Sequence, residues 1–174
     1  MECRIRPKVF SMPFKPASGV VAALVLLMNA WLSGGVLAAG DLTRQEPIEV
    51  VVELGFEGRH AFSPNHLEFE TGKLYRLVLV NNSNAKHYFT SIDFANRVFT
   101  RKVQVMEEVD GKLRRTAEIK GDIREIEVFP GHRAEWWFVP VQTGELDDLH
   151  CYVKDDAANM THAEMGMTGT ITIR

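Results

Sequence analysis

The chain has 174 residues, of which 45% are hydrophobic and 25% charged, and its formal net charge is −3 at pH 7. These values are typical of one globular domain with a hydrophobic core. The slightly acidic balance argues against a nucleic-acid partner, and two cysteines are too few for a disulfide framework. The chain also has no repeat period and no low-complexity tract, which excludes solenoid and disordered classes.

The first 39 residues have the pattern of a secretory signal peptide. Four basic residues precede a long apolar run that ends in small residues at 34–40. Such a segment is removed at a small-residue site, and cleavage after Ala38 or Ala39 fits. The alternative is an uncleaved membrane anchor, since about 20 apolar residues can span a bilayer. In both cases we expect residues 40–174 to be exported, in the periplasm or an equivalent compartment, with membrane contact only through the N-terminal segment.

Export would leave a single thiol in the mature domain. Residues 40–174 contain 16 basic and 22 acidic groups, and Cys151 is the only cysteine among them. In a compartment that favours disulfides, a lone thiol has no partner within its own domain. The sequence therefore indicates another role for Cys151.

The exported part reads as a series of short β-strands without an internal linker. Alternation of apolar and polar residues predicts strands at 47–54, 66–70, 75–80, 87–94, 103–107, 113–119, 125–128, 136–139 and 168–173. Asp110-Gly111 predicts a hairpin turn, and short helical turns are expected within 92–99 and 155–160. These elements favour an all-β fold, an antiparallel sandwich or barrel, in one domain.

Four possible metal ligands lie in two parts of the chain. His87 follows an asparagine-rich loop, whereas Cys151, His162 and Met167 surround the last loop. A thiolate, two imidazoles and a weak thioether are the ligands of blue-copper electron-transfer sites. We therefore predict one copper ion per chain, cycling between Cu(I) and Cu(II). Met167 is the favoured axial ligand, and Met165 remains the alternative.

From residue 60 onward the chain resembles the cupredoxins, the plastocyanin-like type 1 copper proteins. The resemblance lies in Phe-Ser-Pro at 62–64, the strand end and loop at 81–87, Val-x-Pro-Gly at 128–131, and the closing pattern of His, four residues, Met, one residue and Gly at 162–169. It implies a Greek-key β-sandwich with copper at one end. It also implies one histidine ligand from a neighbouring strand and three ligands from the final loop.

Two features depart from the family pattern. His162 follows Cys151 by 11 positions, and electron carriers of this family usually have a shorter loop. The longer loop is expected to hold the second histidine less rigidly. The segment 92–121, with its predicted hairpin, reads as an insertion between the first ligand and the Pro-Gly turn.

The remaining histidines and tryptophans are assigned structural roles. We expect His60, His66 and His132 to face solvent and not to bind the metal. Trp136 and Trp137 should point to opposite faces of one strand.

The leading functional hypothesis is an exported, single-domain, monomeric type 1 copper protein that is not an enzyme. It would transfer single electrons between redox partners such as a cytochrome or a copper oxidase. The first alternative is a copper-handling protein for tolerance or delivery, suggested by Met160 and Met165 near the ligand loop. The second is a copper oxidoreductase assembled across subunits through His150, which precedes Cys151 as in multicopper oxidases and copper nitrite reductases. A strand residue pointing away from copper is the simpler expectation for His150.

Overall fold

The computed structural model describes residues 45–174. The predicted signal peptide or anchor, and the domain start at residue 40, lie outside this range. Within residues 45–174, no helix is long and apolar enough to cross a membrane.

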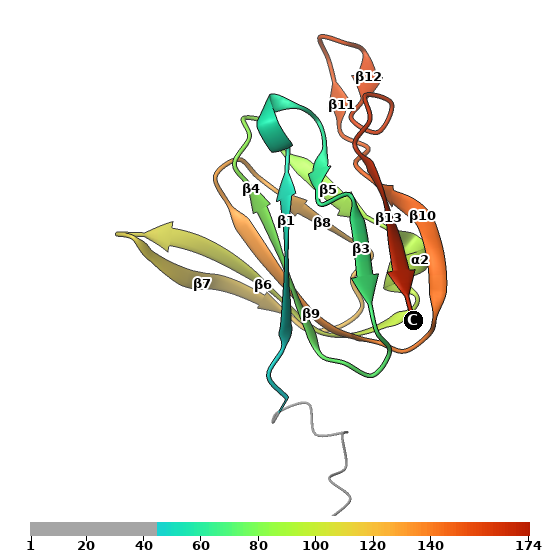
Figure 1. Ribbon diagram of the computed structural model, residues 1–174. Coiled ribbons are helices and arrows are strands. Elements are labelled where there is room, and N and C mark those ends of the chain that lie inside the picture. Colours follow the sequence, from blue (N-terminus) through green and yellow to red (C-terminus); the bar gives the residue numbers. More distant parts are fainter. Residues whose placement is uncertain (1–44) are drawn as a thin grey trace, which may run out of the picture. The chain divides into compact units, whose positions relative to one another are not determined.

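Two curled β-sheets form the body of the domain (Figure 1). The six-stranded sheet has the order β2 (Phe62–Ser63), β1 (Ile48–Leu54), β4 (Tyr75–Asn81), β9 (Arg133–Pro140), β6 (Val98–Val109) and β7 (Lys112–Ile119). The five-stranded sheet has the order β3 (His66–Phe69), β13 (Thr168–Ile173), β10 (Gly144–His150), β5 (His87–Thr90) and β8 (Glu125–Val128). A small hairpin of β11 (Lys154–Asp155) and β12 (Met160–Thr161), a 3-10 turn η1 (Phe56–Gly58) and a short helix α2 (Ile92–Ala95) complete the fold. The predicted all-β sandwich is confirmed.

Two strand pairs run parallel, contrary to the antiparallel arrangement that we expected. β1 pairs with β4, and β3 pairs with β13. Between β1 and β4 the chain crosses to the other sheet to form β3, so a hairpin does not join these two strands. Parallel neighbours require such crossovers. Side-chain alternation indicates a strand but not the direction of its partner.

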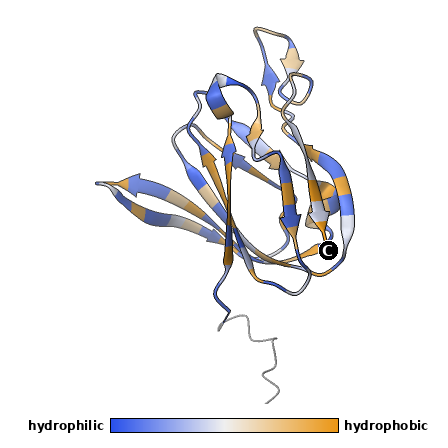
Figure 2. Cartoon of the chain, viewed as in Figure 1, coloured by the Kyte–Doolittle hydropathy of each residue, from blue (hydrophilic) through white to orange (hydrophobic). Residues whose placement is uncertain are grey.

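The core lies between the two sheets and is rich in aromatic rings. Phe94 of α2 packs edge-on against Trp136 and Phe138 of β9, and its ring lies 5.3 Å from that of Phe69. Buried apolar residues alternate with exposed or partly exposed polar ones along β3 and β8, whereas β9 is buried along most of its length (Figure 2). Trp136 is buried, and Trp137 on the opposite face of β9 is partly exposed, as expected.

The segment 92–121 is only partly an insertion. Helix α2 supplies Phe94 to the core, and β6 pairs with β9 from Val98 to Met106, so both belong to the sandwich. The later part forms the predicted hairpin with β7, whose residues are all exposed, and projects from the body (Figure 1). Asp110 and Gly111 both have positive φ angles, 52° and 70°, as such a tight turn requires.

One of the two predicted helical turns is present. The segment 92–99 begins with α2, whereas residues 155–160 contain no helix. Instead, β11 and β12 pair through Lys154 with Thr161 and Asp155 with Met160. The turn between them includes Asn159 in the left-handed region, with a φ of 53°.

Candidate metal centre

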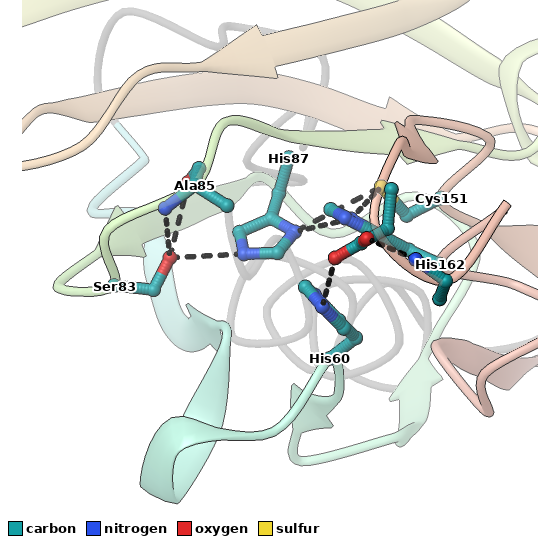
Figure 3. Close-up of polar contacts among 8 residues, drawn as sticks. His60, Ser83, Ala85, His87, Cys151 and His162 are labelled. Atoms are coloured by element: carbon teal, nitrogen blue, oxygen red, sulfur yellow. Dashed lines mark hydrogen bonds and ion pairs between the residues drawn. The ribbon is translucent and has the colours of Figure 1, made fainter. Parts of the chain in front are cut away.

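Three donor atoms converge at one end of the sandwich (Figure 3). His87 begins β5, Cys151 directly follows β10, and His162 directly follows β12. The two Nδ1 atoms of the histidines are 3.1 Å apart, and Cys151 Sγ lies 3.5 Å from Nδ1 of His162 and 3.9 Å from Nδ1 of His87. All three residues are buried. Metal bonds of about 2.0 to 2.3 Å place ligands of one ion roughly 3 to 4 Å apart, so a single ion fits among these atoms.

The position of His87 depends on close contact with two small residues. Its Nε2 atom is 3.0 Å from Ser83 Oγ, which leaves Nδ1 to face Cys151 and His162. Such a bond to the second ring nitrogen fixes the orientation of a ligand imidazole. Gly55 lies against both residues: a Cβ atom there would be 2.5 Å from Ser83 Cβ and 2.7 Å from His87 Nε2.

Asn81 holds the loop that precedes His87. Its buried side chain donates hydrogen bonds to the carbonyls of Ala85 and Val128, each 2.8 Å long. It accepts hydrogen bonds from the N–H and the hydroxyl of Ser83, at 3.0 and 2.8 Å. The sequence predicted the loop but not this role of Asn81. The sequence feature that could have indicated this role is an asparagine at the end of an apolar strand, because a buried amide must find hydrogen-bond partners.

Cys151 is fixed by the neighbouring strand. The backbone N–H of Tyr88 donates to Cys151 Sγ at 3.2 Å, and His150 is paired with Thr90 across β10 and β5. Burial raises the pKa of the Cys151 thiol, while the Tyr88 N–H acts in the opposite direction. Binding of a metal to the thiolate therefore has to displace the thiol proton near neutral pH.

The long loop between the cysteine and the second histidine is a bonded hairpin. The N–H of His162 donates to the carbonyl of Val153, and the N–H of Ala163 to that of Cys151, both at 2.8 Å. β11 and β12 take up the additional residues. Hydrogen bonds therefore anchor the backbone around His162 in spite of the greater length of the loop.

The two candidate axial ligands differ in burial. It is fully buried in the core cluster that contains Cys151, and Met165 is 39% exposed. The carbonyl of Met167 accepts the Cys151 N–H at 3.1 Å, and its N–H donates to the carbonyl of His162 at 2.8 Å. The glycine of the closing motif, Gly169, is needed at its position because there is no room for a side chain. A Cβ atom there would lie 2.5 Å from the Asn65 carbonyl oxygen.

The surroundings of the two histidines disfavour their protonated forms. Burial lowers the pKa of His87 to about 4, with smaller effects from His162 and His60. Burial also lowers the pKa of His162, assisted by His60 and opposed by Asp155. A metal binds the neutral imidazole, so both shifts favour metal binding over protonation.

His60 does not face solvent as expected. Its side chain is 22% exposed, and its ring stacks on that of His162 with 3.7 Å between the centroids. The strand alternation in fact begins later, and residue 60 lies in a loop that η1 folds over the site. Gly55 and Gly58 are the sequence signal of that turn. The expectation that His66 and His132 face solvent is confirmed, since both residues are exposed.

His150 makes contacts outside the three-donor cluster. Its Nδ1 atom is 2.6 Å from the carbonyl oxygen of Asp148, and its ring lies 6.2 Å from that of Tyr152. Tyr152 in turn stacks on Tyr88, with 4.5 Å between the ring centroids.

No protein-family model matches the chain, and no curated protein matches its sequence. Among solved structures, it is similar to a multicopper oxidase from Campylobacter jejuni, a metallo-oxidase, at 16% identity and a TM-score of 0.48, over 74% of this chain and 30% of that one. It is also similar to auracyanin A, a blue copper protein from Chloroflexus aurantiacus, at 14% identity and a TM-score of 0.43, over 74% and 100% of the two chains. A third similar structure is the auracyanin of Roseiflexus castenholzii, at 14% identity and a TM-score of 0.42, over 72% of this chain and 96% of that one. The chain thus spans less than a third of the Campylobacter oxidase.

The sheets and the buried donors define a fold and a kind of site. The fold is a β-sandwich of two sheets, and the three buried donors at one end of it lie close enough together to hold a single metal ion.

Proposed function

We propose that this chain is an exported type 1 copper protein that transfers single electrons and is not itself an enzyme. His87, Cys151 and His162 would bind the ion, with Met167 as the axial ligand. The observation that carries the proposal is the convergence of one thiol and two imidazoles, all buried, within 3.1 to 3.9 Å of one another. A soft sulfur with two imidazoles suits copper in both oxidation states.

The chain prepares the site so that little has to move during electron transfer. When bound, copper supplies a one-electron redox couple. The Ser83 contact holds the ring of His87, the Tyr88 N–H holds the sulfur of Cys151, and backbone bonds hold His162. These contacts lie on three separate segments of chain, and burial keeps water away from the donors. A site with fixed ligands avoids the cost of rearrangement at each transfer.

Export and partners complete the proposal. The signal-like N-terminal segment supports a periplasmic or otherwise exported location, where the lone Cys151 needs a metal rather than a second thiol. A cytochrome or a copper oxidase is the kind of redox partner that such a carrier would serve, as a monomer.

The test is the optical spectrum of the protein purified from cells that produce the full chain and loaded with Cu(II). We expect one copper per chain and intense visible absorption from thiolate-to-copper charge transfer. Cys151→Ser should abolish the band, whereas Cys3→Ser, a change of the only other cysteine, should leave it unchanged. A wild-type protein that binds copper without this band would rule out a type 1 site.

A copper-handling role is the second candidate, favoured by two exposed thioethers near the site. Met160 and Met165 are 41% and 39% exposed, and both lie in the segment between Cys151 and Met167. Thioethers select Cu(I). In this case the Met160→Leu/Met165→Leu protein should protect cells less from copper while its charge-transfer band is retained. Met106→Leu on β6, outside the ligand loop, is the control, and equal protection by all three proteins would contradict copper handling.

A further inference from the structure

His60 belongs to neither the expected ligand set nor the exposed surface, yet it contacts both histidines of the site. Its ring is stacked on His162 at 3.7 Å with 19° between the planes, and it meets His87 edge-on at 5.7 Å. Figure 3 shows the three imidazoles gathered beside Cys151. Because the side chain of His60 is 22% exposed and His162 is almost fully buried, His60 covers its neighbour on the side toward solvent.

We propose that His60 is a positioning residue of the copper site: its ring fixes the orientation of His162 by stacking and closes this ligand to water. The inference rests on the proposed function for its redox consequences. Its structural part, the stacking on His162, stands without copper.

The role that we assign to His60 acts through His162. Donor nitrogens of His60, His87 and His162 all lie within 4.8 Å of one another, but the ring of His60 is placed face to face with that of His162. The lone pair of an imidazole nitrogen lies in the ring plane, so an ion bound by His162 lies beside the face of His60 and not in front of its lone pair. A nitrogen–metal bond needs about 2 Å and alignment with the lone pair. Face-to-face contact thus suits cover and orientation, which aromatic stacking provides in proteins.

Two parts of the chain hold His60 in this place. On one side, the turn at η1 closes with hydrogen bonds from Gly55 N–H to the Ala61 carbonyl, 2.9 Å, and from Arg59 N–H to the Phe56 carbonyl, 3.0 Å. On the other side, Nε2 of His60 lies 3.7 Å from Oδ2 of Asp155.

Asp155 belongs to β11, the hairpin that lengthens the loop between Cys151 and His162. Its other carboxylate oxygen accepts the Ala158 N–H at 2.8 Å, so the acid is itself anchored. The longer loop therefore does more than connect two ligands, because it carries the carboxylate that faces His60.

Removal of the ring would open His162 to solvent. A polar cavity of about 350 Å³ is lined by His60 and His87 together with Glu53, Ser83 and other residues of the two adjoining loops. Without the imidazole of His60, this cavity would extend to the stacked face of His162. Water would then favour the more highly charged oxidised state, because solvent access is one of the factors that set a redox potential.

The first experiment uses the metal-free protein and does not depend on its function. In NMR spectra of the full-length product purified from cells, the ring protons of His162, assigned by their loss in His162→Gln, should be shifted upfield by the His60 ring. His60→Ala should remove this shift, and His60→Phe should keep it. His66→Ala, a change of an exposed histidine, is the control. Identical His162 shifts in wild type and His60→Ala would overturn the proposal.

The second experiment uses the copper-loaded protein. His60→Ala should still bind one copper per chain but show a lower reduction potential and a displaced charge-transfer band, while His60→Phe stays close to wild type. Loss of copper from His60→Ala would make His60 a ligand and overturn the positioning role, as would an unchanged potential and spectrum. A wild-type protein without the charge-transfer band would refute the proposed function alone, since the metal-free spectra decide the stacking separately.

Discussion

At the scale of single residues, the site depends on a glycine that has no chemistry of its own. Gly55 has a φ of 78°, and its missing side chain is what allows Ser83 and His87 to approach the backbone. Gly58, three residues later, shares the left-handed conformation with a φ of 71° but has open space where a Cβ would lie. A substitution of Gly58 therefore introduces backbone strain alone, whereas a substitution of Gly55 introduces the same strain and also a clash with Ser83 and His87.

Gly55→Ala should weaken copper binding and lower the free energy of unfolding by about 2 to 4 kcal/mol, since both strain and overpacking contribute. Gly58→Ala should cost only about 1 kcal/mol and leave copper affinity unchanged. Urea unfolding of the metal-free proteins and competition with a copper chelator measure the two effects. If Gly55→Ala and Gly58→Ala lost the same unfolding free energy and the same copper affinity, the close contact between Gly55 and His87 would have no importance.

That His87, Cys151 and His162 come together could be expected from residue type and order, but the residues that support them could not. A lone thiol followed by histidine and methionine suggests copper without knowledge of the fold. Ser83, Gly55 and His60 act through contacts between loops that are distant in sequence, and a single sequence does not reveal which loops meet. The error over His60 has this origin.

At the scale of elements, the metal centre is a junction of strand ends. Asn81 at the end of β4 bonds to the carbonyl of Val128 at the end of β8, and it also orders the loop that leads to β5. Turn chemistry is local, so the sequence predicted the hairpin at Asp110-Gly111 correctly. Strand partners are not local, and for that reason the parallel pairs were missed.

Asn81→Ala should lower the free energy of unfolding by about 2 to 4 kcal/mol, because it leaves several buried polar groups without a partner. It should also speed copper release, since the loop before His87 loses its anchor. Asn82→Ala is the matched control: Asn82 is exposed and makes one long contact, 3.4 Å, with Glu53. Thermal unfolding measures the loss of stability and the copper dissociation rate measures copper release, in each of the two variants. If Asn82→Ala were as destabilised as Asn81→Ala, the anchoring role of Asn81 would be contradicted.

At the scale of the whole molecule, the buried imidazoles link stability to pH. An unfolded chain has histidines with a pKa of about 6.5, whereas burial lowers the pKa of His87 in the fold to about 4. Between these values the unfolded chain binds a proton that the folded chain does not. Stability of the metal-free protein must therefore fall as the pH is lowered through this window.

For His87 alone, the expected loss of unfolding free energy between pH 7 and pH 4 is on the order of 3 kcal/mol. Urea unfolding of the metal-free protein at several pH values measures it. His87→Gln should flatten the dependence, and His66→Gln at an exposed position should not. A wild-type curve as flat as that of His87→Gln would contradict the effect of burial.

The place of β13 in its sheet also sets the order of events in a newly made chain. This strand lies between β3 and β10, and it follows directly after the methionine that closes the ligand loop. Until it has been inserted, β3 is not joined to the rest of that sheet, whereas β10 and β5, which carry the sulfur and the first imidazole, can already pair. The thioether of Met167 is therefore fixed in the core only when the C-terminal strand has paired with both of its neighbours, which makes it the last of the four candidate ligands to be positioned.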